Sequence, residues 1–359
     1  MFNQMIKMMM KNDFMNILLK NKSDNIPIYC PGYPNQEFIN NYVKKYNLNS
    51  HFKNLTLLNK DYGLIYQMGF DAISIHEFRC EKKYIFKENA LKIDSWGRLY
   101  KNDWYAWDGV FKNEKTLQSW KLLKIPSTKK LKELKKFYPQ IRGKLSILLS
   151  IPGLFEKSWQ SMGFIFFSKL LKKKKFEFIN EVINFFYSYT KRLIKTLQKI
   201  GIQIFIFADD CGYNQREFIP VSIWRKLFLE KYIKLVEIIH EKNGVAVLHS
   251  DGYIINLMDS FIEIGFDAIQ SLEPNSGVNI FELFRKYKDK ICFIGNIDIT
   301  YLIYWTPIEI KEYVEKLISK ARRWDCFLIV SPTQQINSTV NPENVRMMIK
   351  TVKEFNIFQ

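Results

Sequence analysis

The chain has 359 residues, of which 47% are hydrophobic, and its formal net charge is +18. No stretch approaches the ~20 apolar residues that a membrane span needs, so we expect no membrane-spanning segment. The positive charge comes with an abundance of Lys, Asn, Ile, Phe and Tyr that AT-rich coding DNA favours, and no RNP, zinc-finger or helix-turn-helix signature accompanies it. We therefore expect no nucleic-acid partner.

The cysteines and the N-terminal segment indicate a cytoplasmic protein. The 5 cysteines are widely spaced and form no CxxC pair, which argues against a disulfide framework. The first residues, MFNQMIKMMMKND, lack the small-residue cleavage site of a signal peptide. We predict a flexible extension over residues 1–11 and a single domain over residues 12–359.

Short apolar runs of strand-forming residues recur along the chain and predict parallel strands that are buried on both faces. They are Ile26–Tyr29, Ala72–His76, Lys144–Ile151, Gln203–Asp209, Val245–Ser250, Ala268–Glu273, Ile291–Asp298 and Phe327–Ser331. Helical patterns separate them, and such alternation predicts a parallel α/β fold. Eight strands favour a closed TIM (β/α)8 barrel. The alternative, an open doubly wound sheet, lacks support because no GxGxxG follows an early strand.

Apolar residues at helical spacing predict helices over Glu177–Ile200, Pro220–Lys242 and Thr306–Arg323. In the last of these, Thr306 can cap the helix, Pro307 suits its first position, and Glu309 stands where a capping box needs it. We also expect an extra helical segment before the first strand. The connection from about His76 to Lys144 is unusually long, and we predict an insertion after the second strand that crosses the top of the barrel, because loops of this length are uncommon unless functional.

Polar residues follow the predicted strands at the end where barrel enzymes place their catalytic groups. They are His76, Glu77, Asp209, Asp210, Cys211, His249, Asp251, Glu273, Asp298 and Gln334. His249 and Asp251 are the strongest pair, since residues i and i+2 share one face of a strand and can converge on one ion or substrate.

Other strand-end residues have structural alternatives. Asp209 and Asp210 are adjacent, so at most one of them faces the barrel interior. Asp298 is as well suited to capping the next helix as to lining the mouth. Cys211 is the first choice among the cysteines to complete a metal site with His249, although a buried cysteine is usually inert.

Several segments together resemble the uroporphyrinogen decarboxylase superfamily. They include FADDCGYNQREFIP, VLHSDGY, SLEPNSG and FIGNID, followed by TPIEIKEYVEKLI and SPTQQINSTVNPENV. DSWGRLYKND and IPGLFEKSWQSMGF add to the resemblance, which runs from about Pro27 to Glu354. It implies a TIM barrel. The superfamily holds true decarboxylases and the cobalamin-dependent methyltransferases of anaerobes.

The decarboxylase branch implies residues that this chain lacks or alters. Its members grip the acidic porphyrinogen through arginines in an RQAGRY-like segment, whereas Tyr29–Gln36 contains no arginine. The resemblance places Glu77 at the decarboxylase aspartate, Trp159 near its tyrosine and Gln334 near its late histidine. A polycarboxylate substrate needs fixed cations, and decarboxylation needs an acid that protonates the forming carbanion.

The methyltransferase branch implies a zinc ion, which binds a thiol acceptor as thiolate while a corrinoid carries the methyl group. In that branch the zinc ligands are a His-x-Cys pair after strand five and a late cysteine after strand eight. His249 matches the histidine, Asp251 stands at the first cysteine, and Ser331–Thr333 contains no cysteine. An oxygen-rich site of this kind suits a harder metal than a thiolate site does. The sequence is closer to methyltransferase-like members than to true decarboxylases.

We therefore predict a corrinoid-dependent methyltransferase, with a corrinoid protein or a small methyl carrier as partner, as a monomer or homodimer. The alternatives are a uroporphyrinogen decarboxylase without cofactor and a non-catalytic family member. The predicted catalytic residues are His249, Asp251, Glu77 and Asp209. The predicted substrate-binding residues are Trp159, Asp210, Glu273, Asp298, Gln334 and His76, and the predicted zinc ligands are His249, Asp251 and Cys211.

Overall fold

The computed structural model describes residues 13–48, 55–76, 84–85, 91–102, 104–120 and 128–357. An 8-stranded parallel sheet in the order β1-β4-β9-β10-β13-β14-β15-β16 forms its centre. Its members are β1 Tyr29–Cys30, β4 Ala72–Ile75, β9 Ser146–Pro152, β10 Ile204–Ala208, β13 Val245–Ser250, β14 Ala268–Ser271, β15 Cys292–Ile297 and β16 Leu328–Pro332. All eight predicted strands are confirmed.

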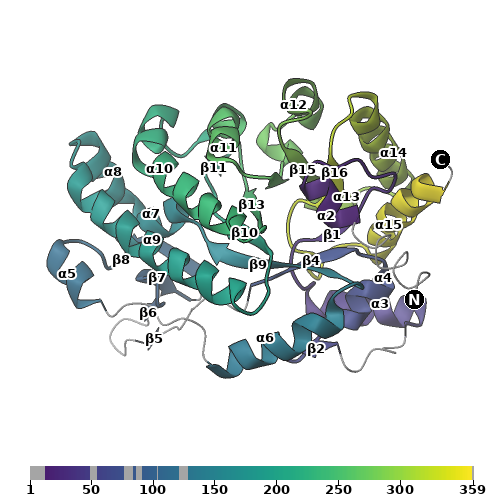
Figure 1. Ribbon diagram of the computed structural model, residues 1–359, viewed down its shortest axis with the longest axis horizontal. Coiled ribbons are helices and arrows are strands. Elements are labelled where there is room, and N and C mark those ends of the chain that lie inside the picture. Colours follow the sequence, from purple (N-terminus) through teal and green to yellow (C-terminus); the bar gives the residue numbers. More distant parts are fainter. Residues whose placement is uncertain are drawn as a thin grey trace.

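The sheet closes on itself between its first and last strands. Ile28 forms a parallel bridge with Val330, and the Val330 N–H donates to the Pro27 carbonyl at 2.9 Å. The predicted TIM barrel is therefore correct, and helices surround the ring of strands (Figure 1).

The strands alternate between two hydrophobic cores. Phe205 and Phe207 of β10 point outward into the core beneath the helices, whereas Ile204 and Ile206 belong to the core inside the barrel. Both faces are apolar, as expected of strands covered on each side. The inner core also receives Phe14, Ile17 and Leu18 of helix α2 (Asp13–Leu18), which therefore packs against the N-terminal end of the barrel interior.

Helices connect successive strands and follow the predicted capping signals. α14 begins with a capping box in which Thr306 and Glu309 bond each other's backbone N–H groups. The helices beyond α2 are α3 Gln36–Tyr46, α4 Tyr62–Met68, α5 Glu114–Ser119, α6 Thr128–Ile141, α7 Leu154–Met162, α8 Phe164–Lys172, α9 Phe176–Gln198, α10 Val221–His240, α11 Met258–Ile264, α12 Ile280–Tyr287, α13 Ile299–Tyr304, α14 Pro307–Arg323 and α15 Pro342–Ile357, with the 3-10 turns η1 Ile255–Leu257 and η2 Pro274–Ser276. In the described residues, no helix combines the length and the apolarity that crossing a membrane requires.

The insertion after the second barrel strand is a 4-stranded antiparallel sheet, larger than a single hairpin. Its strands are β5 Tyr84–Ile85, β6 Leu91–Ile93, β7 Arg98–Lys101 and β8 Trp104–Gly109, and the smaller pairs elsewhere are β2 Thr56–Leu57 with β3 Lys60–Asp61 and β11 Gly212–Tyr213 with β12 Arg216–Glu217. β8 lies beside α7 (Figure 1), where the Phe111 N–H donates to the Ser161 carbonyl at 2.9 Å. This contact brings the aromatic side chains of β8 toward the barrel mouth.

Candidate functional site

A polar cavity of about 490 Å³ lies at the C-terminal ends of the barrel strands. Its wall includes His249 and Asp251 from β13 and the turn after it, Gln270 from β14, and His76 beyond β4. Each lies at an inward position, in step with the apolar inner-core residues of the same strand. The predicted location of the site, at the C-terminal mouth, therefore coincides with a real cavity.

Gln270 fixes the orientation of the His249 ring. Its amide Nε2 donates to the carbonyl of Thr333 at 3.0 Å, which turns its Oε1 toward His249 Nδ1. An amide oxygen only accepts hydrogen bonds, so we infer that Nδ1 carries the proton. In the neutral ring the lone pair is then on Nε2, which faces two carboxylates. A histidine that binds a metal usually donates its other ring N–H to an acceptor in this way.

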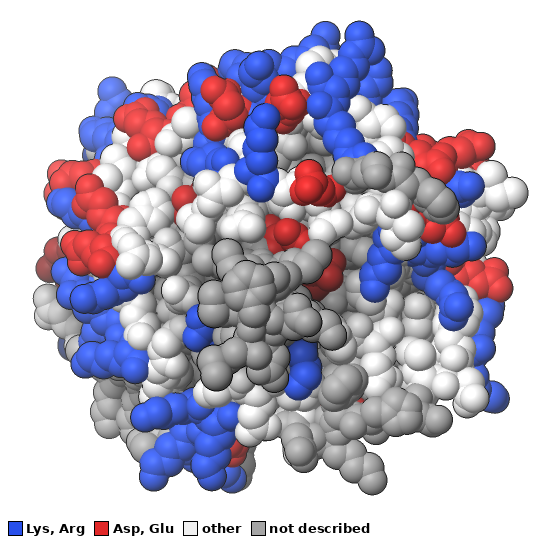
Figure 2. Space-filling view, turned by 45° about the vertical axis from the view of Figure 1, so that its right-hand side comes forward, with Lys and Arg blue, Asp and Glu red and all other residues white. Residues whose placement is uncertain are grey.

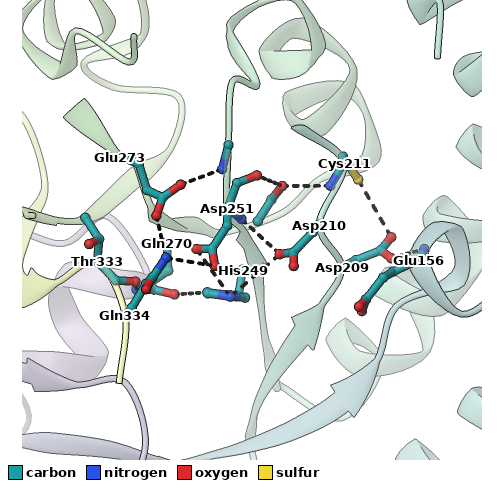
Figure 3. A network of polar contacts seen from close by, with 12 residues as sticks. Glu156, Asp209, Asp210, Cys211, His249, Asp251, Gln270, Glu273, Thr333 and Gln334 are labelled. Carbon is teal, nitrogen blue, oxygen red and sulfur yellow. Dashed lines mark hydrogen bonds and ion pairs between the residues drawn. The ribbon is translucent and has the colours of Figure 1, made fainter. Parts of the chain in front are cut away.

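Those two carboxylates belong to Asp210 and Asp251 (Figure 3). His249 Nε2 lies 3.8 Å from Asp210 Oδ1 and 3.7 Å from Asp251 Oδ1, which is too far for hydrogen bonds. One ligand atom from each of the three residues lies within 4.8 Å of the others. Among the described residues, Asp251 Oδ1 is a buried oxygen without a hydrogen-bond partner. One nitrogen and two oxygens thus converge on a common point.

The electrostatics of this trio favour a bound cation. Burial raises the pKa of Asp251 to about 7, and the neighbouring Asp210 adds to that rise while His249 opposes it. Burial also raises the pKa of Asp210, with a further contribution from Glu156. Burial lowers the pKa of His249, but Asp251 and Asp210 outweigh it, and the net pKa is raised. A positive charge between the carboxylates would relieve their repulsion.

Glu273 and Gln334 connect the trio to the neighbouring loops. Glu273 accepts from the Gly252 backbone N–H at 2.7 Å and from Gln334 Nε2 at 2.7 Å. Gln334 Nε2 also lies 3.5 Å from Asp251 Oδ2 and lines the cavity. Both residues therefore lie at the mouth, where they hold the Asp251 turn in position.

Asp209 faces away from the mouth, in contrast to its predicted place in the pocket. Its carboxylate accepts the backbone N–H groups of Phe155 at 3.2 Å and Glu156 at 2.6 Å, in the first turn of α7. It also accepts the hydroxyl of Tyr232. These contacts cap α7 and join it to α10. Figure 3 shows Asp210 turned toward His249 and Asp209 turned toward Glu156.

Cys211 shares the outward side with Asp209, and the structure corrects its predicted role as a metal ligand. Its Sγ is buried 3.8 Å from Asp209 Oδ2, and burial raises its pKa well above the usual range. A thiol in such surroundings stays protonated, whereas a metal ligand is a thiolate. The residue that lies beside His249 and Asp251 is Asp210, which the sequence analysis predicted only as a substrate-binding residue.

The remaining predicted residues are divided between cap, mouth and groove. Asp298 caps α13 and accepts from the Thr300 N–H at 2.9 Å, which is the structural role that the sequence analysis gave as the alternative to lining the mouth. His76 lines the mouth cavity, and its Nε2 lies 2.9 Å from the Ser74 hydroxyl. Trp159 lines a neighbouring groove. Glu77 lies outside the described residues.

Two features of the site escaped the sequence analysis. Gln270 is the one polar side chain at the centre of the run Ala268–Ser271, and its register partner on β13 is His249. A lone glutamine at an inward position was the available signal. Tyr105 and Trp107 of β8 line the groove beside Trp159, and their period-2 spacing was the signal there.

Together these observations define a TIM-barrel protein with a polar, metal-competent mouth. The chain belongs to the uroporphyrinogen decarboxylase (URO-D) family, whose model matches residues 159–355. A methyltransferase from Methanosarcina mazei has a similar structure, with a TM-score of 0.68 at 15% identity, and the match covers 96% of this chain and 98% of that one. A D-psicose 3-epimerase from Clostridium cellulolyticum H10 matches more weakly, with a TM-score of 0.41 at 10% identity over 82% of this chain and 89% of that one. Comparison with curated proteins gives no sequence match.

Proposed function

We propose that this chain is a metal-dependent methyltransferase that moves a methyl group to or from a corrinoid at the barrel mouth. The observation that carries the proposal is the orientation of His249. Gln270 Oε1 accepts a hydrogen bond from His249 Nδ1, and His249 Nε2 faces Asp210 and Asp251. The structural similarity to a methyltransferase supports the reaction class.

The three side chains fit a divalent metal ion. Ligand bonds of about 2.1 Å to one ion separate two ligand atoms by roughly 3–4 Å, and the distances from His249 Nε2 to the two carboxylates are 3.7 and 3.8 Å. Oδ1 of Asp251 is buried and has no hydrogen-bond partner among the described residues, so it is available to a metal ion. One nitrogen and two oxygens suit zinc or a harder divalent ion. A bound zinc ion would lower the pKa of a thiol acceptor and orient its sulfur.

The residues around the ion have distinct tasks. His249 and the two aspartates would hold it, Gln270 keeps the imidazole in the ligating tautomer, and Glu273 fixes the turn that carries Asp251. The cavity of about 490 Å³ leaves room for a small acceptor beside them. A corrinoid protein or a small methyl carrier would approach at the open end of the barrel.

Decarboxylation of a tetrapyrrole fits the mouth less well. A porphyrinogen substrate carries several carboxylates, which need fixed cations in the wall. Among the described residues that line the cavity, Lys60 is the one Lys or Arg, and Asp251 adds a negative charge beside His249. A single lysine supplies too few fixed cations for a substrate with several carboxylates. Conversion of uroporphyrinogen to coproporphyrinogen would nonetheless establish this alternative.

The test is a methyl-transfer assay with methylcobalamin and a thiol acceptor, in which the loss of the Co–C absorbance measures the reaction. We expect activity in the zinc-loaded wild-type protein and its loss after chelation or in His249→Ala. His240→Ala, which changes a histidine that bonds Asp267 away from the mouth, is the matched control and should retain activity. If the Co–C absorbance stays the same in the zinc-loaded wild type as in the chelated protein and in His249→Ala, for every thiol tried, the proposal is contradicted.

A further inference from the structure

A second hollow, of about 270 Å³, adjoins the mouth and shares Asp251 with it. It also reaches Asp210, and its remaining wall comes largely from the insertion sheet, α7 and the β11–β12 hairpin. We call this hollow the aromatic groove. Pockets for drug-sized ligands have roughly 300–1,000 Å³, so the aromatic groove is sized for a small molecule.

Five aromatic side chains line the aromatic groove and touch one another. Trp107 stacks on Trp159 with ring centroids 5.6 Å apart, and Tyr105 meets Trp159 edge-on at 5.9 Å. Phe218 lies 5.3 Å from Trp159 and 5.4 Å from Tyr213. Trp107 is 51% exposed and Tyr213 is 47% exposed, so these two rings are open to solvent and are not simply part of the core.

The charge in the aromatic groove is negative. Among its described lining residues, Glu156, Asp210, Asp251 and Glu273 are acidic and none is Lys or Arg. Glu156 has a salt bridge with Lys157 at 2.8 Å. Among the described residues, Glu273 accepts hydrogen bonds from uncharged donors, namely the Gly252 N–H, the Ser276 hydroxyl and Gln334. No Lys or Arg of the described groove lining therefore offsets its charge, even when Asp210 and Asp251 hold a metal ion.

We propose that the aromatic groove binds a small methylated onium cation, either a quaternary ammonium or a sulfonium. The faces of Trp and Tyr rings attract such cations, and aromatic cages are the usual means of recognising them. A quaternary ammonium or a sulfonium has no N–H group to satisfy, which suits a wall of aromatic rings and carboxylates. Binding does not depend on the proposed function, but the ligand's role as the methyl-bearing substrate does.

Isothermal titration calorimetry on the full chain, treated with chelator, tests the binding. The probes are choline, trimethylsulfonium and 3,3-dimethyl-1-butanol, which has the shape of choline without its charge. We expect at least one cation to bind roughly tenfold more tightly than the neutral alcohol, the size of a desolvated cation–π contact. The stronger of the two cations identifies the onium class. Equal binding of the alcohol, or no binding of either cation, would overturn the proposal.

Variants separate this proposal from the metal site. Trp107→Leu should weaken cation binding about tenfold, while Trp107→Tyr keeps a ring and should bind within a few-fold of the wild type. Trp104→Leu is the matched control, because Trp104 is 81% exposed on the same strand and does not line the aromatic groove. His249→Ala should lose its metal and keep its affinity for the cation. If the untreated wild type contains its metal ion but the chelator-treated protein binds neither cation, only the groove proposal falls.

Discussion

The two ends of the barrel interior are built from the same strands but have opposite chemistry. Val245 and Val247 of β13 lie in the apolar inner core, and His249 and Asp251 follow at the same inward spacing in the polar mouth. The N-terminal end is packed by α2, whereas the C-terminal end holds a cavity. Position along a strand, and not its face, therefore separates the stabilising residues from those available for chemistry.

The surface charge shows a second contrast with the mouth. On the face in Figure 2, Lys and Arg side chains are spread around the edge and mixed with acidic ones, and they form no single continuous patch. On this face the basic side chains of a chain with a net charge of +18 are dispersed, whereas the described lining of the aromatic groove has acidic residues and no Lys or Arg. The bulk charge gives no indication of which ligand these hollows prefer.

The largest expected effect on stability is at the N-terminal end. Leu18→Ala removes a fully buried side chain of the inner core and should lower the free energy of unfolding by about 2–5 kcal/mol. Leu19→Ala, at an adjacent site that is 45% exposed, is the control and should cost much less. Chemical denaturation followed by circular dichroism measures both. Metal content per folded chain should be unchanged in either variant. A loss of metal in Leu18→Ala would contradict the division of the barrel into a stabilising end and a metal-binding end.

At the mouth, the expected effect is on metal affinity. Gln270→Leu removes the acceptor that keeps His249 Nε2 free, and loss of such an outer-shell contact typically weakens metal binding about 10–100-fold. Competition with a chromogenic chelator measures the affinity. Gln335→Leu, which lines the same cavity but bonds the Tyr33 carbonyl, should bind metal as the wild type does. Gln270→Glu keeps an acceptor and should recover part of the affinity; equal loss in Gln335→Leu would count against a specific role.

The smallest expected effect concerns His240, a histidine far from the mouth. Its hydrogen bond to Asp267 raises its pKa, while burial and Lys20 oppose the rise. A raised folded-state pKa stabilises the protein below about pH 6.5 and loses that contribution as pH rises through the folded pKa. His240→Gln should therefore be less stable than the wild type at about pH 6, by under about 1 kcal/mol because the His240 side chain is 40% exposed, and nearly equal at about pH 8.5. A difference that grows with pH would contradict this.

The sequence predicted the fold well because its signals are local. All eight strands and the capping box at Thr306 rest on apolar patterns and cap residues within short segments. The site was predicted only in part. Adjacent residues on a strand point to opposite faces, so at most one of Asp209 and Asp210 could face inward. Both faces of β10 are apolar, so the pattern could not say which.

Features that depend on tertiary contacts escaped prediction. The role of Gln270 follows from its register beside His249 and from the carbonyl of Thr333, which is 63 residues away in the chain. The aromatic groove needs β8 of the insertion to pack on α7, and no local pattern specifies that contact. Cys211 was misassigned for the same reason as Asp209, since both share the outward side of the chain after β10.

The most direct measurement is the metal content of three purified proteins, namely the wild type, Asp210→Asn and Asp209→Asn, determined by inductively coupled plasma mass spectrometry with circular dichroism as a check on folding. The two variants make the same chemical change at neighbouring residues. We predict about one divalent ion per folded chain in the wild type and in Asp209→Asn, and loss of the ion in Asp210→Asn. A metal-free wild type, or an ion that Asp210→Asn retains, would contradict a metal centre formed by Asp210, His249 and Asp251.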